Sequence, residues 1–323
     1  METVMIPATR RQRRGVQRRR AKMIGAVTCT LNDLLFPVEI RDEPMPSNSE
    51  YSKMVIGQIN GGDFKLNQCS PRYELVPNAE IFPEIETILK KRKIKYRAIY
   101  SHVNNVRFYV DYIIEDPRYA YIMKGTKDKI CPKLTVMHSY NGMTKYKIIF
   151  GYFRLVCSNG LTIAVEEMKQ FNLVIVGKHT EAIKQSLITL NQMLEFFVAE
   201  AAIIIAATTG KYELLGGRMV ANVQDRVKEV LEATKIRTVE YKGRNTVDDI
   251  LSIINKEANP FINEKNKLVN LGYNGKVNDW LVYNAINQYL NDSKRTIAAP
   301  EVRMETDSKV LEYMLENEQP MYK

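Results

Sequence analysis

Two neighbouring stretches of the chain alternate apolar and polar side chains with the two-residue period of a β-strand. The apolar positions are Ile94, Tyr96, Ala98 and Tyr100 in the first stretch and Val106, Phe108, Val110, Tyr112 and Ile114 in the second. Asn104 and Asn105 stand between them, and asparagine tolerates the left-handed backbone of tight hairpin turns. The pattern therefore predicts a β-hairpin with one apolar face.

Further strands are expected at residues 133–139, 145–157 and 161–165, the last two after Tyr-Asn-Gly and Ser-Asn-Gly turns. Ahead of the hairpin, a helix is expected to run from Asn78, as its N-cap, to about Lys91. These elements predict one antiparallel sheet, between about residues 94 and 176, with a flanking helix.

The helical period begins near Thr180, where apolar residues recur at spacings of four and three. These residues are Ile183, Leu187, Leu190, Leu194, Phe197, Ala201 and Ile204. Such a stripe needs a partner, which is either the protein's own sheet and helices or a second copy of the chain.

Shorter helices are expected around residues 220–230 and 246–254, the second with Thr246 and Asp249 spaced as a capping pair. Residues 260–276 are expected to form a polar loop. Asn278 should cap a last helix that contains Trp280, the one tryptophan of the chain.

The predicted fold class is α+β, a mainly antiparallel sheet with a flanking helix followed by an α-helical C-terminal half. The predicted regions are a basic flexible arm (1–24), an extended connection (25–70), an α+β sheet region (71–178), an α-helical region packed on the sheet (179–298) and an acidic tail (299–323).

Charge is distributed unevenly along the chain, whose 323 residues carry a net +10. In the first 24 residues Glu2 opposes eight basic residues, which are Arg10, Arg11, Arg13, Arg14, Arg18, Arg19, Arg20 and Lys22. From Pro300 onward six acidic residues oppose three basic ones. The arm is suited to neutralising phosphates; the alternatives are a solvated arm that aids solubility or a targeting peptide, although the apolar face of a mitochondrial peptide is missing.

The polar face of the predicted sheet combines basic and aromatic side chains. Its expected members are Lys95, Arg97, Arg107, Tyr109, Lys145 and Lys147. Such a mixture suits stacking against single-stranded bases with phosphate contacts alongside. The same composition also describes an ordinary solvated sheet face.

The sequence offers little support for catalysis. His102, His138 and His179 are scattered, and the tightest acidic cluster, Asp111, Glu115 and Asp116, falls on the polar side of a strand and at its end. Thr208-Thr-Gly-Lys211 lacks the upstream glycine of a phosphate-binding loop. We therefore expect no enzyme, no catalytic residue and no cofactor.

The four cysteines, Cys29, Cys69, Cys131 and Cys157, lie far apart without a C-x-x-C pair, so neither a disulfide framework nor a metal site is expected. The longest apolar stretch, residues 196–207, is interrupted by Glu200 and is too short to span a bilayer. We expect no membrane association.

Three segments together resemble a phage/plasmid-like protein family of unknown function. They are residues 72–89, the His138-Ser-Tyr-Asn-Gly turn with Arg154-Leu-Val-Cys-Ser-Asn-Gly-Leu161, and the Trp280-Leu-Val-Tyr-Asn-Ala-Ile helix. The resemblance rests on a Cys-x-Asn-x-Leu turn and a C-terminal Trp-x-x-Tyr-Asn helix, and covers about residues 70–292. The family usually has an acidic residue before the glycine that is Gly142 here, so the resemblance carries over no role of that acid to this chain.

The resemblance implies mobile-element DNA metabolism or a virion role, but supplies no reaction. Physically, Trp280 and Tyr283 share a helix face and are expected to be core anchors, with Asn284 bonded to backbone. Our first hypothesis is a non-enzymatic nucleic-acid-binding protein, of DNA rather than RNA, that coats or anneals single strands in a bacterial host. The alternative is a virion-associated structural protein that forms homo-oligomers or binds other virion proteins.

Overall fold

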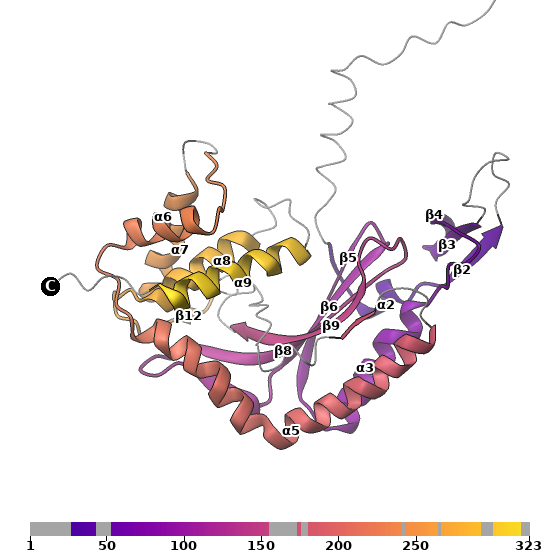
Figure 1. Cartoon of the computed structure of the whole chain (residues 1–323), viewed down its shortest axis with the longest axis horizontal. Helices are drawn as coiled ribbons and strands as arrows, with labels where there is room; N and C mark the ends of the chain where they lie inside the picture. Colours follow the sequence, from indigo (N-terminus) through magenta and orange to yellow (C-terminus); the bar gives the residue numbers. More distant parts are fainter. Residues whose placement is uncertain are drawn as a thin grey trace, which may run out of the picture.

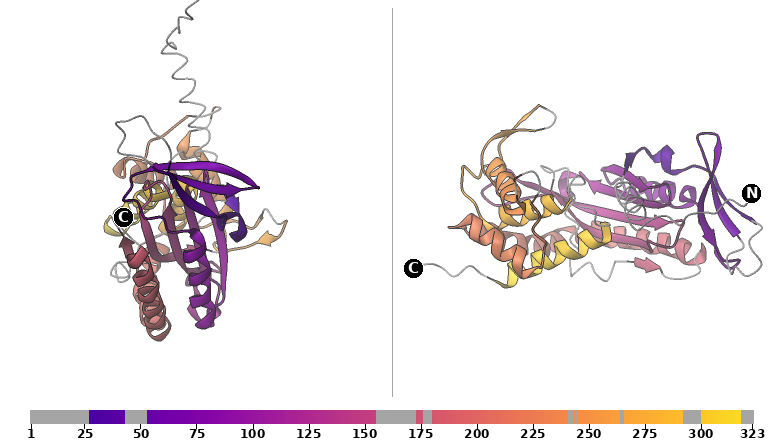
Figure 2. Two further views of the ribbon diagram at one scale, coloured as in Figure 1. Left: turned by 90° about the vertical axis from the view of Figure 1, so that its right-hand side faces the viewer. Right: turned by 90° about the horizontal axis from the view of Figure 1, so that it is seen from above.

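The computed structural model describes residues 27–42, 53–154, 173–175, 180–240, 243, 245–263, 266–291 and 300–317. It confirms the α+β class, with an antiparallel sheet in the first half and mostly helices in the second. The main sheet lies above the long helix α5 (Thr180–Gly217) and above α3 (Asn78–Lys91), as Figure 1 shows. The later helices gather at one end of this sheet and a second, smaller sheet lies at the other (Figures 1 and 2).

The main sheet has the order β1-β5-β6-β8-β9-β10, and β7 also pairs with β8. Every neighbouring pair is antiparallel. Its strands are β1 (Val27–Cys29), β5 (Tyr96–Val103), β6 (Arg107–Ile114), β7 (Tyr121–Ile122), β8 (Lys129–Ser139), β9 (Tyr146–Arg154) and β10 (Leu173–Ile175), with the short 3-10 helix η1 (Pro117–Tyr119) before β7. The expected β5–β6 hairpin is confirmed by the antiparallel pairing of the two strands, and Asn104 and Asn105 in its turn have φ of 53° and 56°. The strand expected at 161–165 lies outside the described residues.

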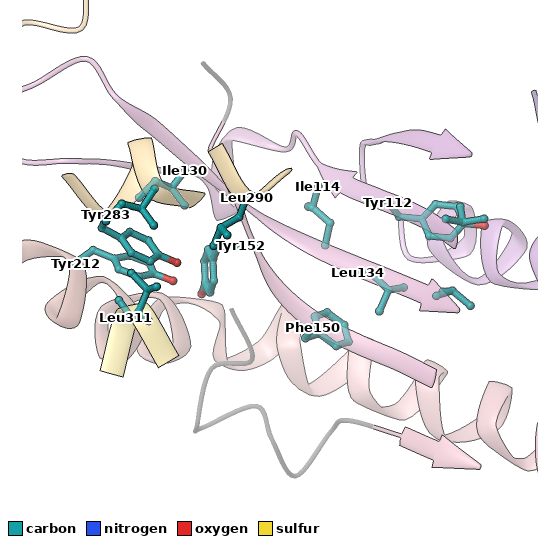
Figure 3. Close-up of a cluster of buried hydrophobic side chains, with 14 of the residues drawn as sticks. Tyr112, Ile114, Ile130, Leu134, Phe150, Tyr152, Tyr212, Tyr283, Leu290 and Leu311 are labelled. Carbon is teal, nitrogen blue, oxygen red and sulfur yellow. The ribbon is translucent and has the colours of Figure 1, made fainter. Parts of the chain in front are cut away.

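One face of this sheet forms the main core, as the two-residue period predicts. Phe108, Val110, Tyr112 and Ile114 of β6 are all fully buried. Across the sheet they join side chains of β8 and β9, and the cluster continues into the C-terminal helices (Figure 3). Val106 belongs to the turn before β6 instead of the strand.

Helix α5 covers this apolar face through part of the predicted stripe. Leu190, Leu194 and Phe197 are buried, and the Phe197 ring lies 5.1 Å from that of Tyr119 and 5.9 Å from that of Phe150. The stripe therefore has its partner within the same chain along these positions. The side chains of Ile183, Ala201 and Ile204 are outside the described set.

The start of α3 corrects one capping prediction. Asn78 is the first helical residue and Pro77 occupies the cap position without a side-chain bond. Asn78 is 1% exposed, and its Nδ2 donates to the carbonyl of Leu34 at 2.9 Å. Its side chain therefore joins α3 to α2 (Leu31–Leu34) instead of capping its own helix.

The described residues of the region 25–70, which are 27–42 and 53–70, form helix and strands, so the prediction of an extended connection is wrong for them. After β1 and α2 they form a three-stranded antiparallel sheet in the order β2-β3-β4. The strands are β2 (Val38–Asp42), β3 (Lys53–Ile59) and β4 (Gly62–Cys69). Val55 and Cys69 enter the main core, so this sheet is part of the same body.

The helical half contains α6 (Val223–Ala233), α7 (Thr246–Ala258) and α8 (Asp279–Asn291). Asn278 caps α8 as predicted, since its Oδ1 accepts from the Leu281 backbone N–H at 3.0 Å. The capping pair of α7 is instead Asn245 and Asp248. Thr246 is buried and its hydroxyl lies 3.0 Å from that of Tyr289, which makes it a contact between α7 and α8. The loop expected at 260–276 contains a small hairpin of β11 (Phe261–Ile262) and β12 (Leu268–Val269).

The predicted acidic tail is also folded in large part. Residues Pro300–Glu316 form helix α9, which packs on α8, α5 and α6. Val310, Leu311 and Met314 are at most 5% exposed, so the helix has an apolar face, and Asp307 is buried with it at 2% exposed. Among the described helices, none is long and apolar enough to cross a membrane.

Candidate nucleic-acid interface

The basic residues predicted for the polar sheet face do share that face. Arg97 of β5 lies opposite Ile113, Arg107 of β6 lies opposite Val103 and Ser139, and Lys147 of β9 lies opposite Met137. Because partners across an antiparallel pair point to the same side, these side chains leave the sheet away from α5. Lys95 and Lys145 directly precede β5 and β9 with the same alternation.

The basic residues occupy the two ends of this face instead of its centre. Lys95 and Arg97 stand at the start of β5, whereas Arg107, Lys145 and Lys147 gather at the opposite end of the strands. We call the second set the far basic group. Arg97 and Arg107 are separated along the sheet by about six residue positions, or roughly 20 Å at strand spacing. The two sets are therefore separate contact points.

Tyr109 does not offer its ring to solvent, so the prediction that it is an exposed stacking platform is wrong. It is 6% exposed and clusters with Val103, Met137 and Ile149 at the centre of the face. Its hydroxyl lies 3.4 Å from that of Thr144. The central part of the face is thus buried, and exposed charge remains at its ends.

The predicted contacts of the arm, Arg10, Arg11, Arg13, Arg14, Arg18, Arg19, Arg20 and Lys22, lie outside the described residues. After residue 26 the described chain begins at β1, the edge strand of the main sheet, which pairs with β5 through Val27 and His102. The arm therefore precedes an edge strand of this sheet in the sequence.

A dense basic run was missed by the period-based analysis. Six of the eight residues from Lys90 to Arg97 are basic, and they form the connection between α3 and β5. We call residues 90–97 the basic connector. The two-residue period identifies only Lys95 and Arg97, because the strand pattern begins there. The signal that finds the rest is the local density of like charge.

Half of the cations in the basic connector have carboxylate partners. Lys90 lies 3.3 Å from Glu86, Arg92 lies 3.0 Å from Glu195, and Arg97 lies 2.7 Å from Glu115. Lys91, Lys93 and Lys95 are exposed and have no carboxylate within 4.0 Å among the residues that the structure describes. These three ammonium groups carry the uncompensated charge of this surface.

The three residues of the tightest acidic cluster each have a different partner. Asp111 accepts from the Thr135 hydroxyl at 2.6 Å and lies 3.4 Å from the Lys133 ammonium, Glu115 pairs with Arg97, and Asp116 pairs with Arg118. Within the described part of the chain, no group of three or more metal-binding side chains occurs.

The described histidines and the segment Thr208–Lys211 take part in the fold instead of forming a site. Burial lowers the pKa of His138 to about 4, and its Nε2 lies 3.1 Å from the carbonyl of Val76. His102 accepts from the backbone N–H of Asn105, and Thr208–Lys211 lies inside α5 instead of in a phosphate loop. His179 and Cys157 lie outside the described residues, and Cys29, Cys69 and Cys131 are free thiols.

Two buried polar centres include residues from the segments that carry the resemblance. In the first, Tyr140 of the Tyr-Asn-Gly turn accepts at its hydroxyl from the Asn78 backbone N–H at 2.9 Å. Its carbonyl accepts from the Tyr73 hydroxyl at 3.0 Å and from Asn67 at 3.3 Å. This residue ties the end of the sheet to α3 and to β4.

In the second centre, Asp128 is fully buried beneath α8. Its carboxylate accepts from Arg154 at 2.7 Å, from the Trp280 indole at 3.0 Å and from the Tyr273 hydroxyl at 3.0 Å. Arg154 also pairs with Glu257 of α7. The arrangement joins the sheet to the helical half and is closed to solvent, so it has the character of a structural joint.

The last motif behaves as predicted. Trp280 and Tyr283 are fully buried with ring centroids 5.8 Å apart, and Asn284 donates to the Trp280 carbonyl at 2.6 Å. The Tyr283 and Tyr212 side chains lie together at the end of the core, beside Tyr152 (Figure 3).

Fold and contacts thus define an α+β protein whose distinctive residues form buried joints and whose uncompensated lysines lie on the surface. The chain belongs to the family described as Domain of unknown function (DUF932), whose model matches residues 65–311. Comparisons with curated proteins and with solved structures gave no match. The family match covers the basic connector and both buried centres, and assigns no reaction.

Proposed function

We propose that this protein is a non-enzymatic nucleic-acid-binding protein that holds the phosphate backbone through basic groups at the ends of its main sheet. The observation that carries the proposal is the exposed, uncompensated charge of Lys91, Lys93 and Lys95 next to Arg97. Lysine clusters of this kind neutralise phosphates and release condensed counterions.

Two further features support the same function. The arm of residues 1–24 has eight basic residues against one acidic residue and precedes β1, an edge strand of the main sheet. The far basic group adds three more cations on the same face of the sheet. As the specific role, we propose binding or annealing of single-stranded DNA for a phage or another mobile element, on the strength of the resemblance in the sequence.

The test is the affinity of the intact chain for single-stranded and double-stranded oligonucleotides over a salt series, measured by fluorescence anisotropy. We expect binding that weakens steeply with salt, and a smaller but measurable affinity in a chain lacking residues 1–24. Absence of binding by the intact chain at low salt would overturn the proposal. Preference for duplex would retain nucleic-acid binding and remove the single-strand role.

A further inference from the structure

The lysines of the basic connector stand on a fixed piece of backbone. Ile94, between Lys93 and Lys95, is 4% exposed and anchors the connection in the core. The carbonyl of Lys95 accepts from the backbone N–H of Glu115 at 3.0 Å. The connection is thus tied to the core and to the end of the neighbouring strand β6, so its side chains project from a preorganised base.

The turn itself has a defined geometry. Lys93 adopts φ of 53°, in the left-handed region, and its backbone N–H donates to the carbonyl of Lys90 at 2.9 Å. Ile94 in turn donates to the carbonyl of Leu89 at 3.1 Å, which closes the end of α3. Lys90 and Lys91 sit in the last turn, where positive charge also favours the helix dipole. Lys93 and Lys95 lie beyond the helix, so the helix dipole does not explain why lysine stands at these two positions.

The aromatic rings near this turn are engaged within the protein and do not present a face for stacking on bases. Tyr96 donates its hydroxyl to Glu86 at 3.1 Å and packs edge-on to Tyr112 with ring centroids 5.7 Å apart. Tyr100 also donates to Glu86. Among the described aromatic side chains, Phe64 of β4 alone is in the exposed class. Base stacking requires an accessible ring face, which this turn lacks.

We infer that Lys91, Lys93 and Lys95 form a phosphate clamp, a site that binds the backbone of a polynucleotide and makes no use of its bases. The inference rests on the proposed function and narrows it to contacts with the phosphate backbone at three named lysines. Each ammonium group contacts one phosphate, and the hydrogen-bonded backbone fixes the positions from which the three side chains extend. The site therefore discriminates weakly between base sequences and depends strongly on salt.

The experiment compares the intact chain with a clamp variant, Lys91→Gln, Lys93→Gln and Lys95→Gln together. The matched control is Lys228→Gln, Lys267→Gln and Lys276→Gln, which removes the same charge from exposed positions of the helical half. Thermal unfolding checks that both variants fold. At moderate salt we expect the clamp variant to bind a single-stranded oligonucleotide at least about tenfold more weakly, and the control to lose much less.

A second probe is an oligonucleotide of the same length without bases. The intact chain should bind it within about twofold of the parent strand, because phosphates carry the interaction. Equal losses in the clamp variant and in the control, or a strong requirement for bases, would overturn the clamp. If the far-group variant Arg107→Gln, Lys145→Gln and Lys147→Gln alone lost binding, the proposed function would stand and the clamp would not. If the intact chain bound neither probe, the proposed function itself would fall.

Discussion

Arg154 and Lys93 represent opposite uses of a basic side chain in one molecule. Arg154 is 1% exposed and paired with two buried carboxylates, Asp128 and Glu257. Lys93 lies on an exposed turn and has no carboxylate partner among the described residues. The first charge is enclosed by its partners and stabilises one arrangement of sheet and helices, whereas the second remains available to an external anion. The buried arginine therefore contributes to the fold, whereas the run of exposed lysines forms the surface that we propose for binding.

The largest expected effect concerns the buried joint. Arg154→Met leaves Asp128 and Glu257 buried without their cation, so we expect the free energy of unfolding to fall by about 3–5 kcal/mol. Urea unfolding measures the change. The control is Lys309→Met, which removes a surface ion pair with Glu305 and should leave stability nearly unchanged. A loss in Arg154→Met no larger than in the control would show that the joint is not structural.

If Arg154→Met does not fold, Glu257→Gln provides a milder test of the same joint. The amide keeps an acceptor oxygen for Arg154 but removes the charge. We expect a smaller loss of stability and an unchanged affinity for oligonucleotides.

The next prediction compares two buried tyrosines, one in the turn after β8 and one in β6. Tyr140→Phe leaves the buried Asn78 backbone N–H without its acceptor, so we expect a loss of about 1–3 kcal/mol in unfolding free energy. The Tyr112 hydroxyl is buried and has no hydrogen-bond partner among the described residues. Tyr112→Phe should therefore be neutral or stabilising. Equal losses in the two variants would contradict the assignment of Tyr140 as a joint.

A smaller effect depends on pH. Burial raises the pKa of Asp307 from 3.8 to about 6, although Asn287 and Tyr283 both donate to its carboxylate. Because the folded state holds this proton more tightly, the contribution of Asp307 to stability is complete below about pH 4 and is lost as pH rises through 6. The slope is at most about 1.4 kcal/mol per pH unit.

The measurement is the difference in unfolding free energy between the intact chain and Asp307→Asn from pH 4 to pH 7. The advantage of the intact chain should decrease across this range. A constant difference would mean that Asp307 keeps an ordinary pKa in the folded protein.

The sequence predicts those elements whose signals are local. The β5–β6 hairpin follows from alternation and two asparagines, and the cap of α8 follows from Asn278. Strand β3 was not predicted because Met54, Val55 and Ile56 are buried in succession, without alternation. Strand β4 was not predicted because it is largely exposed. Helix α9 was not predicted because acidic residues dominate its composition, while its few apolar residues make the contacts with the other helices.

The candidate site was predictable in part, for a related reason. Strand register follows from the period, so Arg97, Arg107 and Lys147 were expected on one face, as the pairing bears out. The burial of Tyr109 depends on what packs over that face, which no local pattern encodes. The joint around Asp128 links residues 26, 103 and 152 positions apart in its pairs, and such contacts have no local signal.

The measurement that tests the central claim most directly is the salt dependence of oligonucleotide affinity in the intact chain and in the clamp variant. Each phosphate contact contributes about 0.7 to the slope of log affinity against log salt for a single strand. The account predicts that the clamp variant loses a slope of about 2, while its unfolding free energy stays unchanged. An unaltered slope would show that these lysines contact no phosphate and would contradict the account.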